Sequence, residues 1–321
     1  MNLEGYIQFE NKIPVLIDCL DQKYPISISG INGFLFTPKM FSGFNEISEH
    51  QLGPLQSPSC GEVKYTNNFY WGSVNSWPKG NSEIQTCSII FPDIDEDEFE
   101  VVANLILNCL EEWRNLLVDN INVALQGNYS GISRIINSTG SSFIGYTLFK
   151  KSSGTNNEFI TKKIQNQSIS VVILNIKGFN QKSLQKILDE TSLKKIPLLP
   201  FYFFLDAEKA ELESNYRKSI LDSATAIEVC FSMIIAKHLP SQNKFNKYIF
   251  SKHYSLSQKR DLLKALEVSL PFTDKEYIVN IDKIRNRVIH GGYSPNTKEI
   301  VASLRITRQT IYTLLPLKYE I

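Results

Sequence analysis

The sequence predicts an α+β fold, in which a β-rich N-terminal domain over residues 1–200, with one or two helices, precedes an all-α helical bundle over residues 201–321. Up to about residue 92, short apolar runs alternate with glycine and proline, as in antiparallel sheets with long connections. From Asp206 onward, apolar residues recur only at steps of three and four, which indicates helices. The chain has 321 residues, 42% of them hydrophobic, so each half has enough apolar material for its own core.

Several short apolar runs in the N-terminal half are predicted to be strands. The clearest is Ile84–Phe91, whose period of two places Cys87 and Ile89 on one face together with Phe91. Further strands are predicted at residues 13–17, 34–36, 142–149, 159–164 and 168–176.

Two helices are expected in the same half. Apolar residues recur at helical spacing from Phe99 to Leu117, and a shorter helix is expected over residues 181–193. Acidic residues crowd positions 93–98, just before the first of these helices. A metal site is conceivable there, but acids also favour the positive end of a helix, and we interpret the run in that way.

Residues 196–204 are apolar and contain two prolines, so we expect them to break regular structure and join the two halves. A flexible linker would be polar, and this segment is therefore expected to pack between the domains. It is too short to span a bilayer, and the N-terminus lacks a basic region followed by an apolar run. The sequence predicts a soluble, cytoplasmic protein with no membrane partner.

Four helices are predicted in the C-terminal half. The first carries an apolar stripe from Tyr216 to Ile234 and ends at Pro240. The third begins at Thr273, which matches a capping box with Glu276. The pair Gly291-Gly292 is a helix stop, so the third helix ends at His290; the second and fourth are expected over residues 257–270 and 297–315.

Bulk charge does not indicate a nucleic-acid partner, because 34 basic and 33 acidic residues leave a formal net charge of +1. Any RNA contact would have to be local, at a patch or an active site. The five cysteines are far apart and no pair has zinc-site spacing, so we expect reduced, mostly buried thiols, no metal and no cofactor.

One element carries several chemically active side chains, namely Arg285, Asn286 and His290 in the last turns of the third predicted helix. Asn286 and His290 are four residues apart, hence only about 40° apart around a helix axis. The long side chain of Arg285 can reach the same end. The sequence therefore predicts a guanidinium, an amide and an imidazole at one helix terminus, beside Gly291, where a nucleic-acid backbone has room to approach.

Metal-free RNA cleavage needs groups of these types. A proton must leave the attacking 2′-hydroxyl and another must reach the departing 5′-oxygen, and histidine can do either near neutral pH. Charge that develops on the phosphoryl oxygens is stabilised by a two-pronged guanidinium. One chain supplies one histidine at this helix, so acid and base together would require two chains related by a twofold axis.

The pattern Arg285-Asn286-x-x-x-His290-Gly291 resembles the RNxxxH signature of the HEPN superfamily of small helical bundles, and residues 216–228 look like the long first helix of such domains. The resemblance covers about 110 residues and implies a homodimer, metal-independent endonucleolytic cleavage of RNA and a toxin-like role in bacterial phage defence by abortive infection. Glu228 matches an acid that supports the motif's arginine. The N-terminal domain stands where such proteins often carry a sensor, which implies a phage-derived or protein trigger.

Simpler interpretations stand beside these. Arg285 could form a structural salt bridge with Glu228, and His290 could satisfy the last carbonyls of its helix. The chain would then be a non-catalytic HEPN-like module for dimerisation and for binding RNA, a nucleotide or a protein.

Four further residues near the predicted motif or bundle could contact RNA or be structural. Arg287 lies on the far side of its helix from Arg285 and could simply be solvated, and Tyr293 could stack on a base or pack in its loop. His238 and His253 flank the connection between the first two helices. Either could approach RNA, but we expect both to be ordinary surface histidines.

Overall fold

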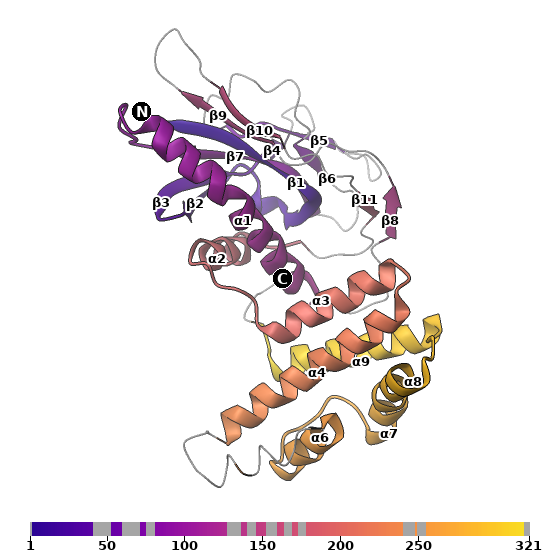
Figure 1. Cartoon of the computed structure of the whole chain (residues 1–321). Coiled ribbons are helices and arrows are strands. Elements are labelled where there is room, and N and C mark those ends of the chain that lie inside the picture. The colour runs from indigo at the N-terminus through magenta and orange to yellow at the C-terminus, as the bar shows by residue number, and fades with distance from the viewer. Residues whose placement is uncertain are drawn as a thin grey trace. The chain divides into compact units, whose positions relative to one another are not determined.

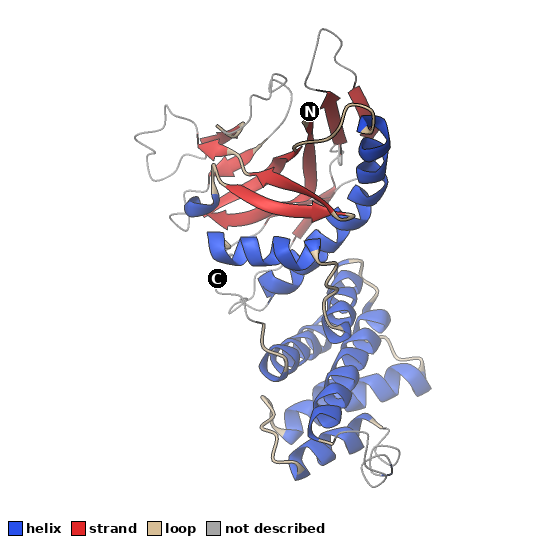
Figure 2. Cartoon of the chain, turned by 90° about the vertical axis from the view of Figure 1, so that its left-hand side faces the viewer, coloured by secondary structure: helices blue, strands red, loops and turns tan. Residues whose placement is uncertain are grey.

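The structure is a computed structural model, and it describes residues 2–40, 53–59, 71–74, 81–126, 136–139, 146–151, 159–163, 169–172, 178–239, 248 and 255–317. The chain divides into two compact units (Figure 1). Unit 1 comprises residues 1–121, 128–196 and 319–321, and unit 2 comprises residues 122–127 and 197–318. A mixed α+β architecture, with an antiparallel sheet followed by helices, agrees with the fold class predicted from sequence (Figure 2).

Unit 1 is built on an antiparallel sheet of nine strands. Its path runs β10-β9-β1-β7-β6-β5-β4, and the β2–β3 hairpin joins it through β3 and β7. A separate pair is formed by β8 and β11. The strands are β1 Leu3–Leu16, β2 Lys23–Ile28, β3 Ile31–Phe36, β4 Lys39–Met40, β5 Gly53–Gln56, β6 Gly72–Val74, β7 Asn81–Phe91, β8 Ile136–Thr139, β9 Tyr146–Lys151, β10 Phe159–Lys163 and β11 Ile169–Val172.

The longest pairing joins β1 to β7, from Leu3 opposite Phe91 to Leu16 opposite Asn81, with a register shift between Gln8 and Ile13. The predicted strand over Ile84–Phe91 is confirmed as part of β7, whose Cys87, Ile89 and Phe91 are all buried. Most of β1 was not predicted, because a polar stretch at residues 10–12 interrupts its apolar pattern.

Two helices follow the first strands of unit 1. Helix α1, Phe99–Gln126, buries a stripe that includes Ala103, Leu110 and Trp113, as the helical spacing predicts. Helix α2, Gln181–Ser192, is capped by the Asn180 side chain, which accepts a hydrogen bond from the Ser183 amide. It lies beside β2, where the Ser192 hydroxyl accepts a hydrogen bond from the Ser27 amide.

The expectation that prolines break regular structure throughout residues 196–204 is wrong from Leu199 onward. Leu199 begins α3, Leu199–Leu212, and Pro200 lies in its first turn, where a missing amide proton costs no helical hydrogen bond. Phe201 and Phe204 are buried in one cluster with Ala226, Cys230 and Ile311, so they belong to the core of unit 2.

Helix α4 is the centre of unit 2, since α3, α6, α8 and α9 all contact it (Figure 1). The helices are α4 Tyr216–His238, α6 Leu256–Ala265, α7 Asp274–Tyr277, α8 Lys283–Gly291 and α9 Thr297–Leu314, with a π-helical segment, Ile278–Asp282, between α7 and α8. The predicted helices over 273–290 and 297–315 agree closely with these bounds, and the predicted capping box of Thr273 with Glu276 is present.

Within the described part of the chain, α4 is the one helix long and apolar enough to cross a membrane, with a mean hydropathy of 1.6 over its best window. The residues of that window are 56% buried by the protein itself. Ile227 and Phe231, on its inner face, are fully buried in the largest apolar cluster of unit 2. Because its inner face is buried in this cluster, α4 serves as a core helix of unit 2.

Candidate functional site

The predicted motif lies on α8, at the end of a helix that begins at the Thr273 cap. Ile284 and Val288 are buried and fix this helix against Ile220 and Ile300. The helix ends at Gly292, whose φ of 61° is a left-handed conformation that glycine adopts without strain. Burial of the inner face leaves the motif side chains on the outer face.

Those side chains are arranged on the last two turns of α8 as their spacing predicts. Asn286 and His290 are exposed, and Arg285 is one third exposed. Neither Asn286 nor His290 makes a hydrogen bond to another described residue, so both polar groups can reach a ligand. A Cβ placed on Gly291 would meet nothing within 4 Å, so the surface beside His290 is open.

Arg285 lies beside Glu228 of α4, the acid that the resemblance singles out. The nearest approach, from Arg285 Nη2 to Glu228 Oε2, is 4.0 Å, which is too long for a hydrogen bond. The other oxygen of the same carboxylate, Oε1, accepts a hydrogen bond of 2.9 Å from Lys259 Nζ of α6. Glu228 therefore faces two cations, holding Lys259 closely and Arg285 loosely.

Lys259 was not identified from the sequence. Its side chain is only 11% exposed, compared with 30% for Glu228 and 33% for Arg285. A signal was present, because Lys259 lies three residues after Leu256 and four before Leu263, both buried, and so on the inner face of α6. A buried lysine needs a partner of opposite charge, and here the partner is Glu228.

The π-helical segment before α8 was also not predicted, although such segments are frequent at functional sites. Its last residue, Asp282, is half-buried, and burial raises the pKa of that carboxyl against the opposing charges of Arg260 and Arg285. Arg260 is held mainly by Asp261, at 2.7 Å. Arg285 thus faces Glu228, acts electrostatically on Asp282, and is hydrogen-bonded to neither carboxylate in the described structure.

The hydrogen bonds given to carbonyls at the end of α8 come from groups other than His290. Arg217, from the first turn of α4, donates to the carbonyl oxygens of Val288 at 3.3 Å and Gly292 at 3.5 Å. The Tyr293 amide donates to the Arg287 carbonyl at 3.2 Å. In the described structure, His290 itself makes no capping hydrogen bond, so capping does not explain its presence there.

Arg287 and Tyr293, the predicted RNA contacts, hold the loop after α8. The Arg287 guanidinium lies 3.4 Å from the centre of the Tyr293 ring and 3.3 Å from Glu299 Oε1. Tyr293 donates a hydrogen bond of 2.8 Å to Glu299 Oε2, and Glu299 completes a capping box with Asn296 at the start of α9. These contacts favour structural roles for both residues, and their contact with RNA stays a prediction.

His238 lies at the end of α4, where its Nδ1 is 2.9 Å from the Ile234 carbonyl oxygen, and His253 falls outside the described residues. No group of three or more residues suited to binding a metal ion occurs in the described ranges.

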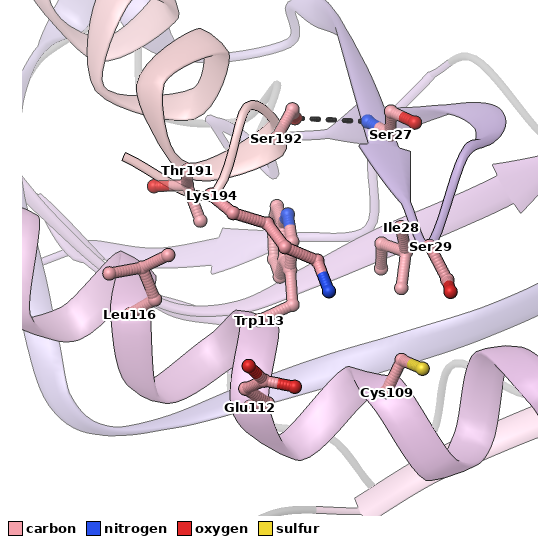
Figure 3. Close-up of a pocket in the computed structure, with 10 residues that line it drawn as sticks. All are labelled: Ser27, Ile28, Ser29, Cys109, Glu112, Trp113, Leu116, Thr191, Ser192 and Lys194. Carbon is pink, nitrogen blue, oxygen red and sulfur yellow. Dashed lines mark hydrogen bonds between the residues drawn. The ribbon is translucent and has the colours of Figure 1, made fainter. Parts of the chain in front are cut away.

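Unit 1 contains a separate small, shallow hollow, open to solvent, between α1, α2 and the β2–β3 turn (Figure 3). Glu112 and Lys194 bring opposite charges to it, and Cys109 lies on its α1 side. The indole nitrogen of Trp113 is buried without a partner and is closed to solvent. A ligand could use the charged groups but not that nitrogen, and the chemical content of the hollow is therefore small.

Comparison with known proteins adds no family: no family model matches the chain, and no curated protein or solved structure matches it significantly. The function is therefore inferred from the motif and its geometry.

Proposed function

We propose that the chain is a metal-independent endoribonuclease. Arg285 binds the scissile phosphate, His290 transfers protons, and Asn286 orients the imidazole or the phosphate. One observation carries the proposal: Arg285 has no hydrogen-bonded partner in the described structure, and His290 is exposed on the same helix end and makes no capping hydrogen bond there. A packed histidine or a fully paired arginine would have argued for a scaffold. The arrangement leaves both groups available to a phosphodiester.

In the proposed reaction, the 2′-oxygen of a ribose attacks the adjacent phosphorus while its proton passes to a neutral imidazole. The bond from phosphorus to the 5′-oxygen breaks, and that oxygen takes a proton from a protonated imidazole. The products are a 2′,3′-cyclic phosphate and a free 5′-hydroxyl. Arg285 stabilises the charge on the phosphoryl oxygens. Lys259 and Glu228 together hold the Arg285 side chain near the site.

Each chain supplies one motif histidine, so the proposal includes a homodimer in which two copies of His290 face one groove. Measurement of the molar mass in solution by light scattering tests this directly. A monomer with full activity would contradict the composite site and leave a single histidine to act alone.

The decisive experiment incubates purified protein with total RNA in excess EDTA and analyses the product ends. Wild-type protein is expected to cut and to leave cyclic phosphates, and His290→Ala should lose this activity. His238→Ala is the matched control, because it removes the other described histidine and should leave cutting intact. Undiminished cleavage by the His290→Ala protein would refute the assignment.

The biological setting is part of the proposal and is supported by the resemblance to HEPN proteins. A cytoplasmic effector that is toxic when released would act in anti-phage defence, with unit 1 receiving a phage-derived or protein trigger. The expected phenotype is growth arrest on expression, absent from the His290→Ala variant.

A non-catalytic binding module is the second candidate, and a specific observation favours it. Arg285 lies within 4.0 Å of Glu228, as a structural ion pair would. Binding of RNA with no cleavage under any condition of the EDTA experiment would select this alternative.

A further inference from the structure

The Lys259–Glu228–Arg285 row joins three helices of unit 2, namely α6, α4 and α8. The central carboxylate uses one oxygen for each cation, at 2.9 Å for Lys259 and 4.0 Å for Arg285. The close contact is the buried one, and the loose contact is the more exposed one. The row therefore runs from the core to the surface at the motif.

An arginine beside a free carboxylate normally forms a two-pronged pair with it, because the guanidinium presents two parallel donors. Such a pair would occupy the same donors that a phosphate needs. At Glu228 no two-pronged pair is formed: the 2.9 Å hydrogen bond from Lys259 to Oε1 orients the carboxylate, and Oε2 lies 4.0 Å from Arg285 Nη2. The lysine thus holds the carboxylate in an orientation from which it attracts Arg285 without forming a close pair with it.

We propose that Lys259 is a positioning residue that holds Glu228 so that Arg285 is oriented but kept free for a phosphate. The inference rests on the proposed function for its ligand, a phosphodiester, and on the observed contacts for its geometry. Asp282 and Arg260 also act on this region, but Arg260 is engaged by Asp261 and the Lys259 ammonium lies on Glu228. Lys259 touches no substrate and acts only through Glu228.

The test compares Lys259→Met, Lys259→Arg and the double variant Lys259→Met/Glu228→Gln. The first readout needs no RNA: phenylglyoxal modifies accessible arginines, and peptide mass spectrometry gives the rate at Arg285, with Arg305 as the internal surface reference. In Lys259→Met, Glu228 should close on Arg285 and slow its modification several-fold. Lys259→Arg should behave like wild type, and the double variant should regain the wild-type rate.

The second readout is the Kd of a labelled oligonucleotide with 2′-O-methyl riboses, which cannot be cut because the attacking hydroxyl is blocked. Coupling between contacting charges predicts a Kd raised roughly tenfold in Lys259→Met and largely restored in the double variant. A merely structural lysine would lower the unfolding midpoint while leaving both the Arg285 reactivity and the Kd of the folded protein unchanged, and that result would overturn the inference.

The two proposals can fail separately. If wild-type protein neither binds nor cuts RNA, the nuclease proposal fails, and the modification rate at Arg285 still decides the role of Lys259. If Lys259→Met does not fold, the double variant is compared with Glu228→Gln alone. Equal Arg285 reactivity and Kd in those two support action through Glu228, and a further loss in the double variant overturns it.

Discussion

Replacement of Arg285 by alanine should affect catalysis far more than stability, and the structure supplies both magnitudes. The ion pair with Glu228 spans 4.0 Å, and the arginine side chain is 33% exposed. Pairs of this kind contribute at most about 1 kcal/mol, because solvent screens them and ordering the side chains costs entropy. We therefore expect the free energy of unfolding to fall by about 1 kcal/mol or less.

The expected effect on cleavage is much larger. Loss of one preorganised donor to a developing oxyanion typically lowers kcat by about 10²–10³-fold, or roughly 3–4 kcal/mol. Cleavage of a labelled RNA under single-turnover conditions in EDTA measures the loss of rate. Urea unfolding of the same samples measures the change in the free energy of unfolding. Arg285→Lys should recover only part of the rate, because an ammonium cannot bind a phosphate in a two-pronged way.

Arg305→Ala is the matched control. Arg305 also forms a loose surface pair, at 3.7 Å from Glu276, and it lies outside the motif. Its replacement should cost a similar small amount of stability and leave the rate unchanged. The reasoning would be refuted if Arg285→Ala lost several kcal/mol of stability, or if both variants lost the same fraction of activity.

Three further predictions concern the fold that supports the site. Asn296→Ala removes the side chain that accepts from the Glu299 amide at the start of α9, and should cost about 1 kcal/mol of unfolding free energy in urea titrations; no change would show that the cap is dispensable. Asp282→Asn should stabilise the protein slightly at pH 7, by less than about 1 kcal/mol. The Asp282 carboxyl, whose pKa is raised by burial, favours the fold when it is protonated and loses that stability as the pH rises through its folded-state pKa. The asparagine side chain stays neutral and does not incur this loss. The advantage of the variant should vanish below the ordinary carboxyl pKa, and an advantage that grows in acid would contradict the assignment. Maleimide should label the partly exposed Cys109 long before Cys230, because burial raises the pKa of the Cys230 thiol to about 12. Peptide mass spectrometry measures both labelling rates, and equal rates would show that the core of unit 2 opens readily.

The helices of unit 2 could be predicted from sequence because their signals are local. Thr273 with Glu276 and the Gly291-Gly292 stop bracket the third predicted helix within a few residues, and each signal depends on backbone groups one turn away. The break between α3 and α4 was less clear in the sequence. Only Asn215, which caps α4 by accepting from the Lys218 amide, marks it.

The sheet of unit 1 could be predicted only as separate strands. Pairing of β1 with β7 joins residues 65–88 apart, and residues 150–151 of β9 pair with Leu3 and Glu4 at the other edge of β1. Nothing in a strand's own alternation of side chains specifies its neighbour, because pairing is settled by packing across the whole sheet. Residues 142–145 of one predicted strand lie outside the described residues, and β9 begins at Tyr146.

The candidate site could likewise be predicted only where its residues lie close together in the sequence. Arg285, Asn286 and His290 were found because they lie on one helix, where spacing alone places them. Lys259 comes from another helix, and its role depends on a contact with Glu228 across 31 residues of sequence. The π-helical turn ending at Asp282 has no sequence signature, since its backbone hydrogen bonds shift without any change in the apolar stripe.

The burial of Lys259 is itself an argument about function. A buried ion pair is weak evidence for stability, because removing two charges from water costs about as much as their attraction returns. Position 259 lies on the inner face of α6 between Leu256 and Leu263, and a methionine there would bury apolar surface without that cost. Glu228 is 30% exposed and would not be left wholly desolvated. Lys259→Met is therefore expected to fold with near-normal stability, and its loss of phosphate binding would then measure what the lysine contributes to the site rather than to the core.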